Sequence, residues 1–175
     1  MANTWRATSQ GVAYASNKDM LDVFNGSSSA RFIRVYRCYM FNNGTSAITG
    51  VLLNITVRRE TAASAGTTVT PVAHNAGNSA LDANTTAGTG RTCTDGSLFR
   101  QLLYQNDEPS VTTLDMDALL TLVPFAEIWN AGYGDTNVDP LVCRASNAEG
   151  VIIRSPGATA VGTADLEIEF TDAAS

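Results

Sequence analysis

The chain has 175 residues, of which 44% are hydrophobic and 16% are charged, and its formal net charge is −6. This length is about one domain, which can bury roughly 70% of its unfolded surface without disulfides or metals. The basic residues are scattered, so no cationic stripe could follow a phosphate backbone, and nucleic-acid binding is not expected. Lys18 is the single lysine among 11 basic residues. Such an arginine bias hints at assembly interfaces, and a general composition bias explains it equally well.

The first thirty residues are polar and rich in small side chains, apart from an apolar patch at 20–24. We expect residues 1–30 to form an N-terminal arm that ends in a short edge element. Residues 31–175 are expected to form a single β-sandwich domain. Within it, the segment 60–97 is dominated by Ala, Thr, Gly, Ser and Asn and is predicted to be a long loop excursion. Residues 97–105 fit a helical stripe behind a serine N-cap as well as a strand, and we favour a short helix or turn there.

The segment 31–41 is the longest run of aromatic and β-branched residues, which is typical of a strand. Its alternation is imperfect, because a regular strand would place Val35 on one face and Cys38 and Met40 on the other. Two explanations stay open. Either a β-bulge near Tyr36 changes the register, or the second apolar face meets a neighbouring subunit.

The remaining strands are predicted from alternation and from turn residues between the runs. The terminal strand is the clearest, because Leu166 and Ile168 point to one face while Glu167 and Glu169 point to the other. We expect that acidic face to be exposed to solvent. The pattern predicts an all-β fold, a two-sheet β-sandwich that is jelly-roll-like, with long loops and at most one short helix. The predicted strands after the first are 51–58, 69–72, 119–129, 140–144, 151–154 and 164–170.

The cysteines and the single histidine do not form a recognisable reactive set. Cys38, Cys93 and Cys143 are an odd number, widely spaced and without a CxxC pair, which argues against a disulfide framework or a zinc site. Cys38 and Cys143 lie in strand-like runs and are expected to be small buried hydrophobes. His74 lies in a small-residue segment, and we favour a surface histidine over a catalytic base.

Two groups of acidic residues are candidate sites. Asp115 and Asp117 would share one face of a strand and suggest a carboxylate pair for glycoside hydrolysis, but a solvated turn is the favoured interpretation. Asp135, Asn137 and Asp139 resemble the start of a calcium loop. A proline occupies the position that needs glycine, so an Asx-rich turn is favoured over a cation site.

Glycines and aromatic residues give two weaker candidates. Residues 88–90 lack the lysine and helix of a phosphate loop, and we interpret them as flexible chain. Trp5, Trp129, Asn130 and Tyr133 could form an exposed platform for a sugar or peptide. Packing in the core or at a subunit contact is the favoured use of these aromatics. No catalytic, cofactor-binding or metal-binding residue is therefore assigned.

Three C-terminal segments resemble a known class of protein. Residues 139–144 (DPLVCR), 149–154 (EGVIIR) and 162–170 (GTADLEIEF) are similar to strands of small structural proteins from tailed bacteriophages. The resemblance implies a jelly-roll sandwich similar to tumour-necrosis-factor-like domains, often trimeric, in proteins that decorate or cement capsids or form virion appendages. It implies no active-site residues. The N-terminal half carries no such resemblance.

These observations predict a non-enzymatic virion structural protein, a capsid decoration or cement protein that acts as a homotrimer on the major capsid protein. No cofactor, nucleic acid or membrane partner is expected, and no export signal or apolar anchor is recognised. One alternative is a carbohydrate- or receptor-binding module of a phage appendage. A jelly-roll hydrolase or cupin is a third hypothesis, and it is disfavoured because cupins need several histidine ligands.

Overall fold

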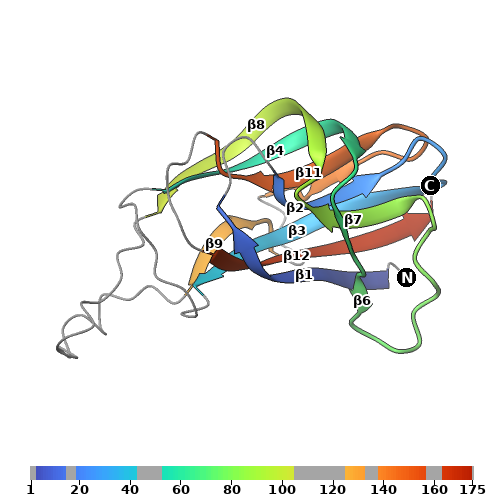
Figure 1. The fold of residues 1–175 in the computed structure, drawn as a ribbon. Coiled ribbons are helices and arrows are strands. Elements are labelled where there is room, and N and C mark those ends of the chain that lie inside the picture. The colour runs from blue at the N-terminus through green and yellow to red at the C-terminus, as the bar shows by residue number, and fades with distance from the viewer. Residues whose placement is uncertain are drawn as a thin grey trace, which may run out of the picture.

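The computed structural model describes residues 3–14, 19–42, 53–104, 125–132, 138–156 and 163–174, and every helix or strand element in these ranges is a β-strand. All strand pairs are antiparallel, and the strands form two sheets (Figure 1). The strands are β1 (Asn3–Ala13), β2 (Asp19–Asn25), β3 (Arg31–Asn42), β4 (Leu53–Ser64), β5 (Thr67–Val69), β6 (Val72–Ala73), β7 (Thr85–Thr89), β8 (Thr92–Tyr104), β9 (Phe125–Asn130), β10 (Leu141–Cys143), β11 (Glu149–Arg154) and β12 (Thr163–Ala174).

The order of the strands identifies the sandwich as a jelly roll. The first sheet has the order β10-β3-β12-β1-β6, with β9 also paired to β3, and the second has the order β5-β7-β2-β11-β4-β8. We count β9 and β10 as one interrupted strand and leave out the short β5, β6 and β7. The first sheet then contains the first, eighth, third and sixth strands, and the second contains the second, seventh, fourth and fifth, which is jelly-roll order. The predicted all-β, two-sheet, jelly-roll-like sandwich is confirmed.

The imperfect alternation of β3 has its cause in a bulge at Tyr36. Glu169 of β12 lies opposite Arg37, but the next residue, Phe170, lies opposite Val35, so Tyr36 is an extra residue. The bulge turns Cys38 to the inner face that Val35 occupies, and both side chains are fully buried. The first of the two explanations is confirmed. The Tyr36 carbonyl also accepts a hydrogen bond from the Ala131 backbone N–H at 2.8 Å, at the point where β9 ends.

The terminal strand β12 alternates as predicted on its inner face. Leu166, Ile168 and Phe170 have no exposed surface. The opposite face was expected to be exposed to solvent, and this expectation is wrong. Only 9% of Glu167 and 4% of Glu169 is exposed. Long side chains from the neighbouring strands cover these two carboxylates.

Residues 97–104 lie in strand β8, so the expected short helix or turn is wrong. Their apolar pattern looked helical because a bulge breaks the alternation of the strand. Val57 lies opposite Arg100 and Arg58 lies opposite Leu98, which leaves Phe99 as an extra residue. Adjacent apolar residues at 98 and 99 are therefore a consequence of the bulge.

The two predicted irregular segments contain sheet strands. Most of the expected N-terminal arm is strand, since β1 lies between β12 and β6, and β2 lies between β7 and β11. Neither is an edge strand. The expected loop excursion 60–97 includes the end of β4, all of β5, β6 and β7, and the start of β8. Threonine is β-branched and is enriched in strands, so the polar composition of this segment does not mean a loop.

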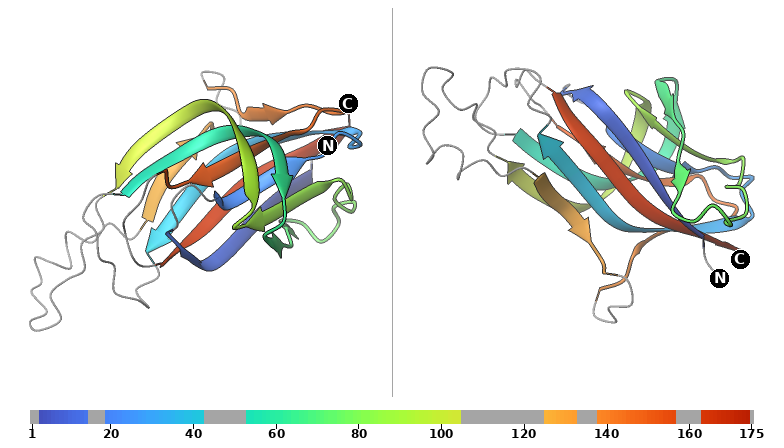
Figure 2. Two further views of the ribbon diagram at one scale, coloured as in Figure 1. Left: turned by 45° about the horizontal axis from the view of Figure 1, so that its top comes forward. Right: turned by 90° about the horizontal axis from the view of Figure 1, so that it is seen from below.

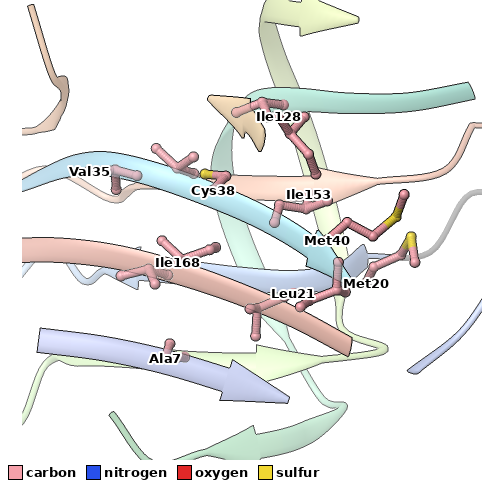
Figure 3. Packing of buried hydrophobic residues seen from close by; sticks show 14 of the residues in the cluster. Ala7, Met20, Leu21, Val35, Cys38, Met40, Ile128, Ile153 and Ile168 are labelled. Carbon is pink, nitrogen blue, oxygen red and sulfur yellow. The ribbon is translucent and has the colours of Figure 1, made fainter. Parts of the chain in front are cut away.

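The hydrophobic core lies between the two sheets. Figure 3 shows Ile168 and Cys38 of the first sheet and Leu21 and Ile153 of the second among the packed side chains. Views from other directions show the same two layers (Figure 2). No helix occurs in the described residues, so none there is long and apolar enough to cross a membrane.

Candidate functional site

The second sheet is curled so that its two edges approach each other. β4 and β5 lie four strand positions apart in the sheet, yet only Ala65 and Gly66 connect them, both with positive φ (59° and 74°). A flat sheet would separate these strands by about 19 Å, since neighbouring strands lie about 4.8 Å apart. Three Cα steps span at most about 11 Å. The connection is therefore possible only because the sheet curls. The two-residue link between β7 and β8 also requires the curl, since these strands are four positions apart as well.

The bent ends of two paired strands cross the outer face of this curled sheet. β4 pairs with β11 only from Thr56 to Glu60, and beyond that point it pairs with β8 alone. Register shifts in the β4–β8 pairing bend both strands, as β-bulges do. Figure 1 shows β4 and β8 curving together over the second sheet. We call these two paired segments, residues 61–64 and 92–95, the covering ribbon.

Acidic side chains lie on the face beneath the covering ribbon. Asp22 and Glu60 have no exposed surface, and Asp19 is 3% exposed. One ligand atom from each of Asp19, Asp22 and Cys93 lies within 4.8 Å of the others, which makes these three residues a possible metal-holding group among the described part of the chain. The Glu60 carboxyl interacts with Asp22 and Cys93. We call Asp19, Asp22, Glu60 and Cys93 the acidic cluster.

A bulge in β2 brings two of these carboxylates to one face. Residues three apart on a regular strand face opposite sides. Leu21 lies opposite Ile153, however, while Asp19 lies opposite Arg154, so Met20 is an extra residue. Asp19 and Asp22 then share the outer face, and Met20 and Leu21 both enter the core.

Arg91, in the link between β7 and β8, is the cation beside the cluster. Its Nη1 donates to Asp22 Oδ2 and to Thr86 Oγ1, both at 3.1 Å, and its Nη2 donates to the Ala87 carbonyl at 2.8 Å. Arg91 is 8% exposed. Its guanidinium thus satisfies one oxygen of Asp22 and leaves the other five carboxylate oxygens of the cluster without a hydrogen bond of good geometry.

Two glycines make room for the cluster on the sheet. A Cβ at Gly150 would lie 2.7 Å from Glu60 Cγ, and a Cβ at Gly88 would lie 2.6 Å from Arg91 Cζ. Real Cβ atoms essentially never approach other atoms that closely. The Glu60 and Arg91 side chains therefore lie directly over glycine positions of β11 and β7, where any other residue would displace them.

Burial raises the pKa of each carboxyl in the cluster. The pKa of Glu60 rises to about 9, first by desolvation and then by repulsion from Asp22. The pKa of Asp19 rises to about 7 for the same two reasons. Desolvation raises the pKa of Asp22 to about 6, against the attraction of Arg91. Desolvation and the adjacent carboxylates also raise the pKa of the Cys93 thiol. Ionising the cluster is thus costly unless a further cation is present.

Elsewhere the same chain pairs a buried carboxylate completely. Glu149 accepts hydrogen bonds from the backbone N–H and Nε of Arg144, each at 2.9 Å, and contacts Arg59 Nη1 at 3.4 Å. The Arg144 side chain and backbone hold the pKa of Glu149 below its usual range. Arg59 also lies 5.2 Å from the Phe99 ring. The acidic cluster has no comparable set of donors.

A second polar region covers the outer face of the first sheet. Arg6 contacts Glu167 at 3.1 Å and Glu169 at 2.8 Å, and Arg37 lies 3.6 Å from Glu169. His74, predicted to be a surface histidine, lies here with 35% of its side chain exposed and its Nε2 3.7 Å from Glu169 Oε1. This network explains how the acidic face of β12 is buried while its charges stay paired.

Aromatic and arginine side chains line the same face along β3. Tyr39 and Phe41 are half-buried, with ring centroids 6.0 Å apart, and Arg34 lies 5.9 Å above the Phe32 ring. These residues lie opposite Glu167, Asp165, Thr171 and Ala173 of β12, so they are on its acidic side. We call Phe32, Arg34, Tyr39 and Phe41 the outer β3 face.

The sequence candidates among the aromatics do not form a platform. Trp5 is 8% exposed, and its Nε1 donates to Asp172 Oδ1 at 3.0 Å inside the sandwich. Trp129 is half-buried, 6.5 Å from the Phe99 ring, on β9, which is separated from β1 by two strands. The preferred interpretation, packing in the core, is confirmed for Trp5. Asn130 is exposed, and Tyr133 lies outside the described residues.

The other candidates fall in different places. Residues 88–90 are the end of β7 and a tight turn, in which the Gly90 N–H donates to the Asp19 carbonyl at 3.1 Å. The interpretation of these residues as flexible chain is therefore wrong. Cys38 and Cys143 are buried free thiols, as predicted. Asp139 is exposed. Four acidic or amide candidates lie outside the described residues: Asp115, Asp117, Asp135 and Asn137.

The acidic cluster was missed because its members are far apart in the sequence and no motif joins them. Charged residues are almost never fully buried unless they are paired. A usable signal did exist in β2, where Asp22 interrupts an apolar run instead of flanking it. The bulge at Met20 and the curl that brings Cys93 across the sheet have no signature of that kind.

Comparison with known proteins gives no matching family model, no matching curated protein and no matching solved structure.

Proposed function

We propose that this chain is a virion structural protein that decorates or cements a bacteriophage capsid as a homotrimer. The fold is consistent with the resemblance, since the three similar segments contain strands β10, β11 and β12. These strands belong to both sheets of the sandwich, so the resemblance concerns how the whole sandwich is built. A fold by itself does not imply a function, and the proposal needs a surface that could contact neighbours.

The outer β3 face is the observation that carries the proposal. The bulge at Tyr36 explains why Cys38 and Met40 are buried, but it leaves Tyr39 and Phe41 on the opposite side. Tyr, Phe and Arg are enriched at the centres of protein interfaces. The face also contains strand residues only, which makes it rigid. A rigid surface loses little conformational entropy on binding.

Mechanistically, each copy would add contact area between neighbouring capsid subunits. Individual contacts can be weak, because many symmetric copies and three linked binding surfaces raise the effective affinity. A partner that binds the assembled shell and not its separated subunits stabilises the shell by mass action.

The decisive experiment measures whether the chain is part of a particle. Quantitative mass spectrometry of virions made by the replicon that encodes this chain is expected to find it in a fixed ratio to the major capsid protein. Light scattering after size-exclusion chromatography is expected to show trimers. A monomer that is absent from purified particles would overturn the proposal, and specific signals on a glycan array would favour a carbohydrate-binding module instead.

A further inference from the structure

We propose that the acidic cluster is a structural zinc site whose four ligands are its three carboxylates and the Cys93 thiolate. The proposal begins from unsatisfied groups. Both oxygens of Asp19, both oxygens of Glu60 and one oxygen of Asp22 are buried without a hydrogen-bond partner of good geometry. Buried polar atoms are rarely left unpaired. The three carboxyls and the Cys93 thiol interact with one another, and a cation among them would pair with oxygens that no protein donor satisfies.

The arrangement leaves the right atoms available. Arg91 occupies Asp22 Oδ2 and leaves Oδ1 free to bind a metal. The ligand atoms of Asp19, Asp22 and Cys93 already lie within 4.8 Å of one another. A tetrahedral site with bonds of about 2.0 to 2.3 Å needs ligand atoms somewhat closer together. A small movement of flexible carboxylate side chains toward the ion would provide this.

Glu60 is the fourth ligand of this proposal and would have to move toward the ion, because its carboxylate is not among the ligand atoms that lie within 4.8 Å of one another. Its carboxyl has no exposed surface and interacts with both Asp22 and Cys93. It reaches them from β4, the strand that bends over the sheet, whereas the two aspartates come from β2. Cys93 belongs to the covering ribbon, so the ion would join the sheet to that ribbon. A site with four protein ligands is closed, which is typical of structural zinc and not of catalytic zinc.

The donor set selects the metal. Thiolate sulfur together with carboxylate oxygens suits Zn²⁺, whereas Ca²⁺ and Mg²⁺ prefer oxygen donors alone. Charge favours a divalent ion, because the Arg91 guanidinium pairs with Asp22 alone among the three carboxylates. The two arginines on the neighbouring strands, Arg58 and Arg154, pair with Asp95 outside the cluster. Cys93 is half-buried while Asp19 and Asp22 are buried, so the sulfur side offers an entry path for the ion.

The test uses the full chain, stripped with a chelator and then titrated with Zn²⁺ or Co²⁺. We expect one ion to bind per chain, a higher urea midpoint, and a sulfur-to-cobalt charge-transfer band. Cys93→Ser and Asp19→Asn are expected to weaken binding by more than about 100-fold, since even residues behind a ligand cost 10- to 100-fold. Asp139→Asn, an exposed aspartate on another loop, is the matched control and should bind like the parent chain.

A thiol measurement keeps the test valid if those variants fold poorly. The chain has three cysteines, and Cys38 and Cys143 are buried. Alkylation mapped by mass spectrometry should therefore modify Cys93 first in the folded parent chain, and Zn²⁺ should slow that modification. Absence of zinc binding, or binding without the cobalt–sulfur band and without protection of Cys93, would overturn the proposal. Binding that Asp139→Asn removes would do the same.

Discussion

Replacing Arg91 with methionine tests whether the buried guanidinium holds the acidic face together. Methionine keeps much of the aliphatic volume and removes the charge, so the main loss is the pairing. Arg91 donates three hydrogen bonds and pairs with the fully buried Asp22. Removing one partner of a buried ion pair costs about 3–5 kcal/mol, because the other charge stays buried and unpaired.

That loss is large for a protein whose whole free energy of unfolding is about 5–15 kcal/mol. Urea denaturation of chelator-treated protein at pH 7, followed by the fluorescence of Trp5 and Trp129, measures it. Arg100→Met is the control, because Arg100 is exposed on β8, and surface substitutions of this kind change stability by about 0.5 kcal/mol or less. A loss below about 1 kcal/mol for Arg91→Met, with an unchanged m-value, would refute this account of the pairing.

Further predictions concern the cluster, the core, the surface and the pH dependence. Gly150→Ala is expected to cost about 1–3 kcal/mol in urea denaturation, because its Cβ would collide with the Glu60 side chain; an unchanged midpoint would contradict that packing. Ile168→Ala, at a fully buried core position, should cost about 2–5 kcal/mol in the same assay, and a smaller loss would mean that the core collapses around the gap. If the chain forms the proposed trimer, Arg34→Glu should abolish it in light scattering and leave the free energy of unfolding within about 0.5 kcal/mol of the parent, whereas a trimer that persists would place the interface elsewhere. The pKa of Glu149 is lower in the folded protein than in the unfolded chain. Its ion pairs therefore stabilise the fold fully at pH values above the unfolded-state pKa, and this stabilisation is lost as the pH falls through the folded-state pKa. Glu149→Gln should therefore destabilise the protein at pH 7 and have little effect in acid, and an equal effect at both pH values would exclude this linkage.

The sequence predicted the sandwich because inner-face alternation survives in most strands. The terminal strand is the clearest case, since Leu166, Ile168 and Phe170 are all buried. Bulges account for what could not be predicted. Each adds one residue and reverses the apparent face of those that follow. At Tyr36 the broken alternation was visible, so a bulge could be considered, whereas at Phe99 it imitated a helix.

The acidic cluster could not be predicted from the sequence for a related reason. It depends on a bulge at Met20 and on a sheet that curls far enough to bring Cys93 over β2. Curl results from the accumulated twist and bends of many residues, and no local pattern encodes it. Composition was misleading in the same region, because threonines that suggested a loop form β5, β7 and part of β8.

The pairing of β1 with β12 has a practical consequence for engineering this protein. Asn3 lies directly opposite Asp172, and Figure 1 shows the N and C labels close together. Cargoes attached at the start of β1 and at the end of β12 would therefore lie at the same end of the first sheet. A short linker there could also close the chain and allow new ends to be opened in a surface turn.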